Sequence, residues 1–224
     1  MRITALDPQA HQPDRWNLHI DGAFAFALDG AVVVREGLYV GRELTDDELE
    51  QLRAVAQEQD LYAAALHFLA PRPRSRAEVR RRLLRPRPRH DPPSAAAVER
   101  VLEQLERAGY VNDGDFAAFW VENRERFSPR SARALGVELR QRGIARETVE
   151  AATAPELDDE RALAAGRARL RSFRGLDYKS FRERMGAFLL RRGFSYGVAG
   201  PVVRQLWAES SGDRPAEADA DDTE

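Results

Sequence analysis

The 224-residue sequence contains no cysteine, which excludes disulfide bonds and thiolate metal sites. No apolar run approaches the roughly 20 residues that a helix needs to span a bilayer, and the segment Met1–Thr4 lacks the apolar stretch of a secretory signal. Lysine is almost missing too, since Lys179 is the only lysine among 35 basic residues. From these absences we expect a cytoplasmic protein whose positive charge is carried by arginine.

Motifs of common catalytic sites are missing as well. The sequence has no P-loop, no glycine-rich dinucleotide-binding motif and no nucleophile elbow. Four histidines are scattered without the spacing of metal ligands: His11, His19, His67 and His90. Asp113 and Asp115 could form a carboxylate pair, but they stand where acids cap a helix and complement its dipole. We therefore expect no enzyme, no cofactor and no metal site.

The net charge of −2 hides an uneven distribution. Residues 1–60 carry −7 and residues 213–224 carry −5, which leaves about +10 for residues 61–212. A basic centre of this kind steers the chain toward an anionic partner. Arginine suits bidentate contacts with phosphate and carboxylate groups, although a biased genome composition would give the same preference.

Alternating apolar residues predict a β-hairpin near the N-terminus. Two such runs, Trp16–Ile20 and Phe24–Leu28, flank the turn residues Asp21-Gly22. The segment Ile3–Leu6 is expected to add a third strand. The segment Ala31–Val34 fits either a strand, because of its β-branched residues, or a short helix.

Helical signals dominate the rest of the chain. The segments Thr45–Glu48 and Ser75–Glu78 are capping boxes that open helices. The pattern Leu, three residues, Gly, large apolar residue occurs at Leu105–Tyr110, Leu139–Ile144 and Leu189–Phe194. Glycine at this position favours a left-handed helix end, and the apolar residue after it can fold back onto the last turn.

A spacing of about 50 residues between similar segments predicts tandem three-helix repeats that stack on their neighbours. We expect an N-terminal hairpin region with a helix over 1–60 and repeats over 61–112, 113–156 and 157–208. Residues 209–224 are expected to form a disordered acidic tail. The helical spacing of Phe116, Phe119 and Trp120 favours core packing over base stacking.

Several of these segments together resemble the RecX family of regulators of the RecA recombinase. Gly109–Asp113, followed by Phe116-Ala117, is similar to the family's hallmark, and Phe188–Ser195 is similar to its C-terminal signature. Segments Glu138–Ile144 and Ser75–Val79 and the N-terminal hairpin fit as well. The resemblance covers about residues 1–207.

The resemblance implies a mainly α fold, with tandem three-helix repeats in an elongated, curved molecule and a small N-terminal β-hairpin region. It implies a monomer that binds the groove of the RecA–DNA filament and inhibits its ATPase, strand-exchange and co-protease activities, modulating recombinational repair and the SOS response. Two departures stand out. Leu83–Arg87 lacks the glycine of the other second helices, and Pro201 should either delay the last helix to Gly200 or kink it.

Arginines are the candidate contacts with the RecA filament or DNA. The cluster between Arg72 and Arg89 is offset nearby only by Glu78 and Asp91. Its alternative is a solvated helix face, and in the later repeats interleaved Glu138 and Glu183 favour partial self-neutralisation. The candidates are Arg76, Arg80, Arg81 and Arg85, then Arg130, Arg133 and Arg140, then Arg182, Arg184, Arg191 and Arg192. The alternative function is a general helical-repeat DNA-binding protein without a dedicated recombinase partner.

Overall fold

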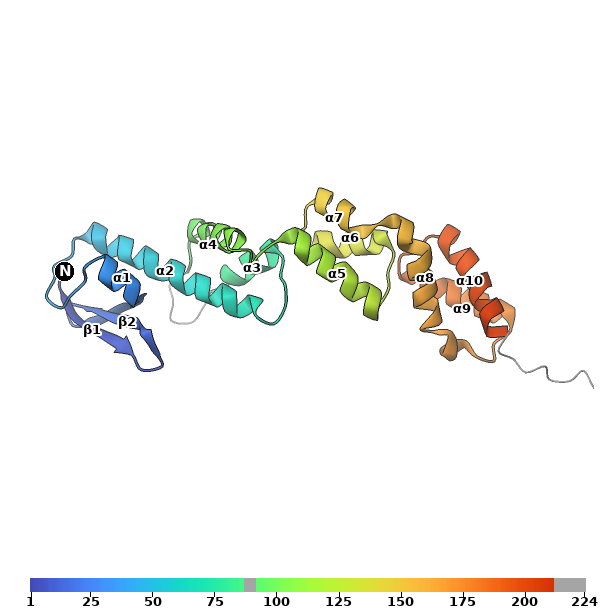
Figure 1. Ribbon diagram of the computed structural model, residues 1–224, viewed down its shortest axis with the longest axis horizontal. Helices are drawn as coiled ribbons and strands as arrows, with labels where there is room; N and C mark the ends of the chain where they lie inside the picture. The colour runs from blue at the N-terminus through green and yellow to red at the C-terminus, as the bar shows by residue number, and fades with distance from the viewer. Residues whose placement is uncertain (87–91, 212–224) are drawn as a thin grey trace, which may run out of the picture. The chain divides into compact units, whose positions relative to one another are not determined.

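The computed structural model describes residues 1–86 and 92–211. The chain divides into two compact units, Met1–Asn112 and Asp113–Glu224 (Figure 1). Helices make up most of both units, and the first unit also holds a small antiparallel sheet.

The first unit begins with the sheet that the alternating residues predicted. Strands β1 (Ile3–Gln9), β2 (Gln12–Ile20) and β3 (Ala23–Asp29) pair antiparallel in that order. Asp21 has φ +48° and Gly22 has φ +86°, and two positive φ values in succession are those of the tight hairpin turn that Asp-Gly favours. The hairpin and the third strand are both confirmed.

The segment that fitted either a strand or a helix is the helix α1 (Gly30–Arg35). Val32 and Val33 are neighbours in sequence and both are buried, whereas Val34 is 81 % exposed. A strand would have sent Val32 and Val33 to opposite faces. Burial of both against one core therefore favours the helix over the β-propensity of the segment.

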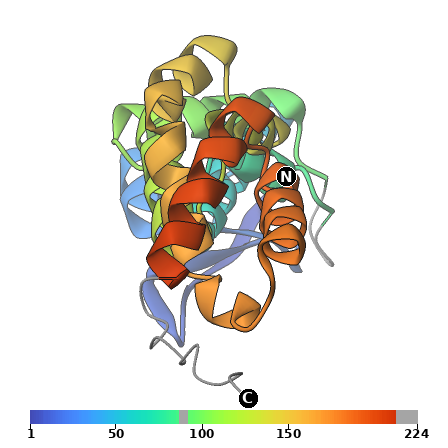
Figure 2. The same cartoon turned by 90° about the vertical axis from the view of Figure 1, so that its right-hand side faces the viewer.

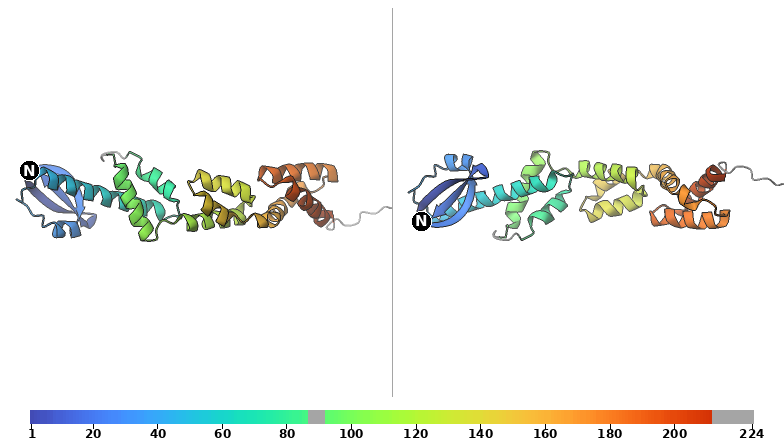
Figure 3. Two further views of the ribbon diagram at one scale, coloured as in Figure 1. Left: turned by 90° about the horizontal axis from the view of Figure 1, so that it is seen from above. Right: turned by 90° about the horizontal axis from the view of Figure 1, so that it is seen from below.

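Helix α2 (Asp46–Leu69) runs without a break through the position where the sequence suggested a boundary between residues 60 and 61. Its predicted capping box is confirmed, since Thr45 and Glu48 exchange hydrogen bonds in both directions. The first half of α2 lies against the sheet (Figure 3). Leu52 and Ala56 belong to the core that they share. The second half of α2 buries Leu61 and Ala65 in the core of the first repeat.

That core is completed by α3 (Arg76–Leu83) and α4 (Ala95–Arg107). The cap of α3 is confirmed, because the hydroxyl of Ser75 accepts a hydrogen bond from the N–H of Glu78. Helix α3 ends at Leu83 with Leu84 as its C-cap. The residue after this cap, Arg85, does not have a positive φ, so α3 lacks a left-handed glycine end. Arg87 and Arg89 of the predicted arginine cluster, and Asp91 beside it, lie outside the described residues. So does the predicted acidic tail beyond residue 211, whereas its first three residues, 209–211, are the end of a helix.

The second unit contains two three-helix repeats. Helices α5 (Asp113–Phe127), α6 (Ala132–Gln141) and α7 (Arg146–Thr153) surround one core. Helices α8 (Asp158–Arg167), α9 (Tyr178–Arg191) and α10 (Tyr196–Ser211) surround the other, with α10 drawn in red in Figure 2. Short 3-10 turns, η1 (Pro155–Leu157) and η2 (Leu170–Phe173), connect these helices.

The three predicted glycine helix ends are confirmed. Each glycine has a positive φ, of +75°, +83° and +92°, and each following N–H donates to the carbonyl of the leucine five residues earlier. The glycine N–H donates in turn to the carbonyl three residues before it, which completes a Schellman motif. The glycines are Gly109, Gly143 and Gly193.

The apolar residue after the glycine behaves differently in the first case. Ile144 and Phe194 are buried, but Tyr110 is 55 % exposed and Val111 takes the buried place instead. The expectation that this residue folds back onto its helix is therefore right for two of the three ends. At the first end the chain buries the smaller side chain one position later.

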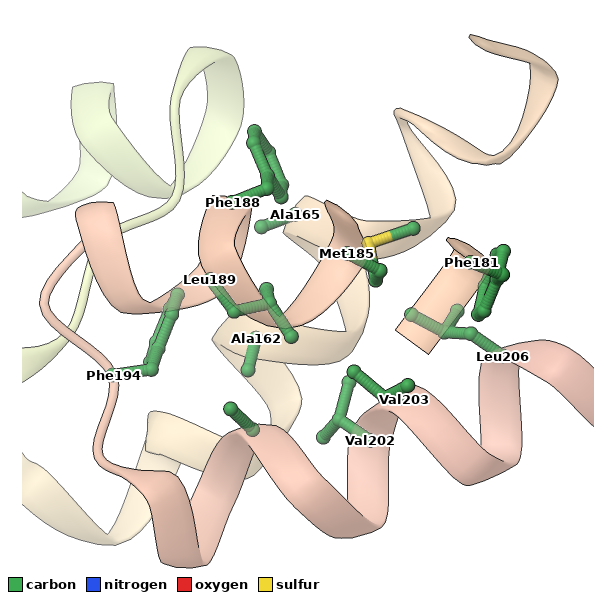
Figure 4. Packing of buried hydrophobic residues seen from close by; sticks show 11 residues of the cluster. Ala162, Ala165, Phe181, Met185, Phe188, Leu189, Phe194, Val202, Val203 and Leu206 are labelled. Atoms are coloured by element: carbon green, nitrogen blue, oxygen red, sulfur yellow. The ribbon is translucent and has the colours of Figure 1, made fainter. Parts of the chain in front are cut away.

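The core of the third repeat forms where α8 and α10 approach closely (Figure 4). A Cβ atom on Gly166 would overlap Leu206, so glycine is needed for this approach. Helix α10 starts at Tyr196 and continues through Pro201, so the late start at Gly200 is wrong. The hydroxyl of Ser195 accepts a hydrogen bond from the N–H of Val198 and begins the helix ahead of the proline.

Of the three aromatic residues of α5 that were predicted to pack in the core, Phe116 and Trp120 do so, whereas Phe119 is half-buried outside this core. Phe116 is fully buried, and Trp120 is half-buried against it with the ring centroids 6.1 Å apart. Asp113 and Asp115 lie in the first turn of α5, where their charge complements the helix dipole.

Candidate functional site

Arg76 and Arg80 of α3 face two carboxylates of α4. Nη2 of Arg76 lies 2.8 Å from Oε2 of Glu99, and its Nε lies 2.8 Å from Oε1 of Glu106. Nε of Arg80 lies 2.6 Å from Oε1 of Glu99. Burial lowers the pKa of Arg76, but its hydrogen bonds and charge pairing with Glu99 and Glu106 outweigh burial and raise it. Hydrogen bonds from Arg80 and Arg76 lower the pKa of Glu99. The face that the sequence favoured is therefore largely neutralised within the repeat.

Arg81 and Arg85 share another face of α3, because they are four residues apart. Both side chains are exposed. Within the described ranges neither has a carboxylate partner, and Nε of Arg81 donates only to the carbonyl of Ala77 at 3.3 Å. This outer face keeps its positive charge available.

Phe68, near the end of α2, carries two further guanidinium groups. The guanidinium carbon of Arg74 lies 4.2 Å from the centre of the Phe68 ring, and that of Arg82 lies 6.0 Å from it. Burial, followed by the positive charge of Arg72, lowers the pKa of Arg74. Cation–π contact holds both groups over the ring. An anion near Arg74 would relieve the repulsion between the guanidinium groups of Arg74 and Arg72.

In the second repeat the carboxylate of Glu138 forms ion pairs with two arginines and accepts a hydrogen bond from a tryptophan. Nε of Arg124 lies 2.8 Å from Oε2 and Nε of Arg130 lies 3.1 Å from Oε1, while Nε1 of Trp120 donates to Oε2 at 2.7 Å. Trp120 is contacted by Arg124 at 4.7 Å and by Arg142 at 3.5 Å from its ring centroid. One carboxylate thus supports a cluster in which positive charge exceeds negative charge.

This cluster borders an open groove of about 980 Å³ in the second unit. The predicted residues Arg130 and Arg133 line it, together with Ser195 and Tyr196 at the start of α10. Tyr196 is 81 % exposed. Arg140 is also exposed, but it does not line this groove.

In the third repeat, Phe188 carries the guanidinium groups of Arg169 at 5.5 Å and Arg192 at 4.7 Å. Nη1 of Arg192 also donates to Oγ of Ser128 at 3.2 Å and to the carbonyl of Pro129 at 2.9 Å. Burial, followed by the charges of Arg130 and Arg169, lowers the pKa of Arg192. Arg192 is thus partly engaged in joining α9 to the connection between α5 and α6.

A smaller pocket of about 460 Å³ lies beside Phe188. Its rim includes the predicted residues Arg184 and Arg191 together with Arg169, and Phe173 contributes to its apolar floor. The predicted residue Arg182 is exposed outside this lining.

The three repeats share one feature, which we name the arginine–aromatic cluster: an aromatic ring contacted by two guanidinium groups. Its members are Phe68 with Arg74 and Arg82, Trp120 with Arg124 and Arg142, and Phe188 with Arg169 and Arg192. Sequence reasoning considered Arg142 as part of a basic stripe but missed Arg124 and Arg169. The i, i+4 spacing of Trp120 with Arg124, and of Phe188 with Arg192, is the signal that could have indicated such clusters.

The described ranges, 1–86 and 92–211, contain neither a metal-binding cluster nor a membrane-spanning helix. No three His, Asp or Glu side chains there are grouped so that they could hold a metal ion. In those same ranges no helix is both long and apolar enough to cross a membrane.

Family models match the chain in four places. They are described as the regulatory protein RecX N-terminal domain, over residues 1–45, and the first, second and third three-helix domains of RecX, over 62–85, 112–152 and 156–203. Two solved structures share the fold. The crystal structure of regulatory protein RecX has a TM-score of 0.66 and 22 % identity, covering 90 % of this chain and 98 % of the other. The crystal structure of RecX from Lactobacillus salivarius has a TM-score of 0.56 and 21 % identity, covering 68 % and 97 %.

Relatives with curated names agree with these models. The regulatory protein RecX of Streptomyces coelicolor is 35 % identical over 170 residues, which cover 75 % of this chain and 83 % of the relative. The regulatory protein RecX of Bacillus subtilis is 29 % identical over 219 residues, which cover 96 % and 81 %. On the combined agreement of domain order, sequence identity and fold, this chain belongs to the RecX family of regulatory proteins.

Proposed function

We propose that this protein restrains the RecA recombinase by binding the RecA–DNA filament through the arginine surfaces of its three-helix repeats. The supporting observation is the set of exposed arginines that keep their charge beside the arginine–aromatic clusters. Family membership makes the recombinase the natural partner. In this proposal the protein lowers the ATPase, strand-exchange and co-protease activities of the filament and so limits recombinational repair and the SOS response.

The chemistry of the clusters suits an anionic partner. An aromatic ring fixes the plane of a guanidinium group, so an N–H edge that is not already bonded within the chain can bind a ligand with less loss of side-chain entropy. Such an edge matches phosphate or carboxylate oxygens. Contacts of this type do not read base sequence, and their strength falls as salt rises.

Inhibition follows if the protein prefers one filament geometry. A ligand that binds one conformation better than another shifts the population toward it, by no more than the difference in binding free energy. Holding the filament in a state that does not complete its hydrolytic cycle would lower all three activities together. The charges would supply association rate and orientation.

The direct test is ATP hydrolysis by RecA on single-stranded DNA while this protein is titrated in. We expect ATP hydrolysis to be inhibited when a few equivalents of this protein have been added. Unchanged hydrolysis, despite tight binding to bare DNA, would contradict the proposal and favour a general DNA-binding protein.

The two faces of α3 allow a sharper test of the surface. Arg81→Gln with Arg85→Gln removes the outer charges, and we expect the slope of log K against log salt to fall by about 0.7–0.9 for each phosphate that the variant no longer neutralises. Arg76→Gln with Arg80→Gln is the matched control, because those charges are already paired with Glu99 and Glu106. A larger fall with the control pair would show that the inner face binds the phosphates.

A further inference from the structure

Residues 167–192 form the most one-sided part of the second unit in charge, with nine basic and two acidic residues. Few of the charges are neutralised locally. Arg167 pairs with Glu209 at 2.7 Å, and Asp177 is engaged in capping α9 through the N–H of Ser180. Within the described ranges the following exposed side chains have no carboxylate partner: Arg169, Arg171, Arg174, Lys179, Arg182, Arg184 and Arg191.

Three of these arginines surround one pocket. Arg169, Arg184 and Arg191 line the 460 Å³ pocket beside Phe188. Glu183 is the acidic residue among its lining residues. Such a rim favours a ligand that brings several carboxylates or phosphates at once.

The chain leaves α10 close to this surface. Near the end of α10, Glu209 pairs with Arg167, and the Trp207 ring lies 5.4 Å from Tyr178 and 5.3 Å from Phe181. The end of α10 is therefore fixed beside the end of α8 and the start of α9 (Figure 2). Residues that follow Ser211 therefore leave the repeat near Arg167 and Tyr178, within the basic segment 167–192.

We propose that residues 212–224 of this chain bind the surface formed by Arg169, Arg184 and Arg191. These 13 residues include six acidic and one basic residue, so their charge complements that of residues 167–192. Extended, they reach about 43–47 Å, whereas the 14 residues of α9 span about 21 Å. The segment is thus long enough to reach Arg169, Arg184 and Arg191. Because it is tethered by a short connection, its effective concentration at this surface is in the millimolar range.

The segment 212–224 contains no large apolar residue. Its binding therefore rests on charge, and it weakens as salt shortens the screening length to about 8 Å near physiological ionic strength. Bound there, the segment competes with any external polyanion for the same guanidinium groups. This competition would tune filament binding, and that last step alone rests on the proposed function.

Paramagnetic relaxation in the full-length chain tests the binding directly. The absence of cysteine means that Thr223→Cys gives a single site for a nitroxide label. We expect the label to broaden the amide signals of Arg184, Ala187 and Arg191 at low salt, and the broadening to disappear at high salt. Undisturbed α9 signals at low salt would overturn the proposal.

Charge reversal supplies the matched comparison. Arg184→Glu with Arg191→Glu should abolish the broadening. Arg35→Glu with Arg146→Glu changes the charge equally at exposed arginines elsewhere and should preserve it. Equal broadening in both variants would show that the segment does not recognise this surface.

Competition is measured with an oligothymidylate as the probe. A segment that occupies the surface about nine-tenths of the time weakens a competing ligand about tenfold, so deletion of 212–224 should tighten binding by that factor. In the Arg184→Glu, Arg191→Glu background the deletion should have little effect. If deletion of residues 212–224 from the parent chain left the affinity for oligothymidylate unchanged, the proposed competition would be overturned. No recombinase is present in either measurement, so a failure of the RecA proposal leaves both outcomes intact.

Discussion

Among the described residues, Arg161 is the charged side chain that is buried, and its loss should destabilise the second unit. It is 4 % exposed, and its Nη1 donates to the carbonyls of Thr153 at 2.6 Å and Ala154 at 2.9 Å. Its Nε and Nη2 both donate to Oε1 of Glu125, at 2.8 and 2.6 Å. One guanidinium group thus joins the end of α7, the start of α8 and the side of α5.

The magnitude follows from these contacts. Removing one partner of a buried ion pair costs about 3–5 kcal/mol because the other partner is left uncompensated. Glu125 is 39 % exposed and can recover water, so the cost on its side is reduced. The carbonyl of Thr153 is less able to do so, since Thr153 is 5 % exposed. We therefore expect Arg161→Met to lower the free energy of unfolding by about 3 kcal/mol.

Urea denaturation can measure this change. In a Trp16→Phe background, the remaining tryptophans, Trp120 and Trp207, both report on the second unit. Arg146→Met is the control, because Arg146 and Glu150 form an exposed ion pair, which should contribute little to the free energy of unfolding. A loss at Arg161 below about 1 kcal/mol, or one equal to the control, would refute the reasoning.

Two further predictions concern local geometry. Gly193→Ala should destabilise the chain by about 1–3 kcal/mol more than Gly109→Ala, because a Cβ at 193 would lie 2.5 Å from Oγ of Ser131 while the space around Gly109 is open; similar urea midpoints would contradict this. Hydrogen bonds from the N–H of Thr45, and then from Arg42, lower the pKa of Glu48 below its usual 4.5. Its contribution is complete above pH 4.5 and is lost as the pH falls through the lowered pKa of the folded chain. Glu48→Gln should therefore flatten the acid side of the thermal stability profile, and a parallel profile would count against the cap.

Features that depend on neighbours along the chain could be predicted. The hairpin at Asp21-Gly22, the cap at Thr45 and the glycine ends of α4, α6 and α9 are each specified within about six residues. Such features follow from backbone preferences of a few side chains, so a sequence alone is sufficient.

Features that depend on partners far away in the sequence could not be predicted. The carboxylates of Glu99 and Glu106 lie 19 to 30 residues from the arginines of α3 that they neutralise, and no local pattern indicates that they meet. The core residue after Gly109 was misassigned for a related reason, because the neighbouring helices had room for Val111 rather than Tyr110. The three-helix fold was thus predictable, whereas the charge available on each face required the packing.

The unbroken helix α2 fixes the rotation and distance between the residues that it contributes to two separate cores. Leu52 and Ala56 pack in the core of the sheet, and Leu61 and Ala65 pack in the core of the first repeat. Both pairs belong to the same continuous helix. Each residue added between them rotates the later pair by about 100° and moves it by about 1.5 Å. The spacing of the two pairs is therefore as constrained as their chemistry, and this stretch should resist insertions that an ordinary linker would absorb.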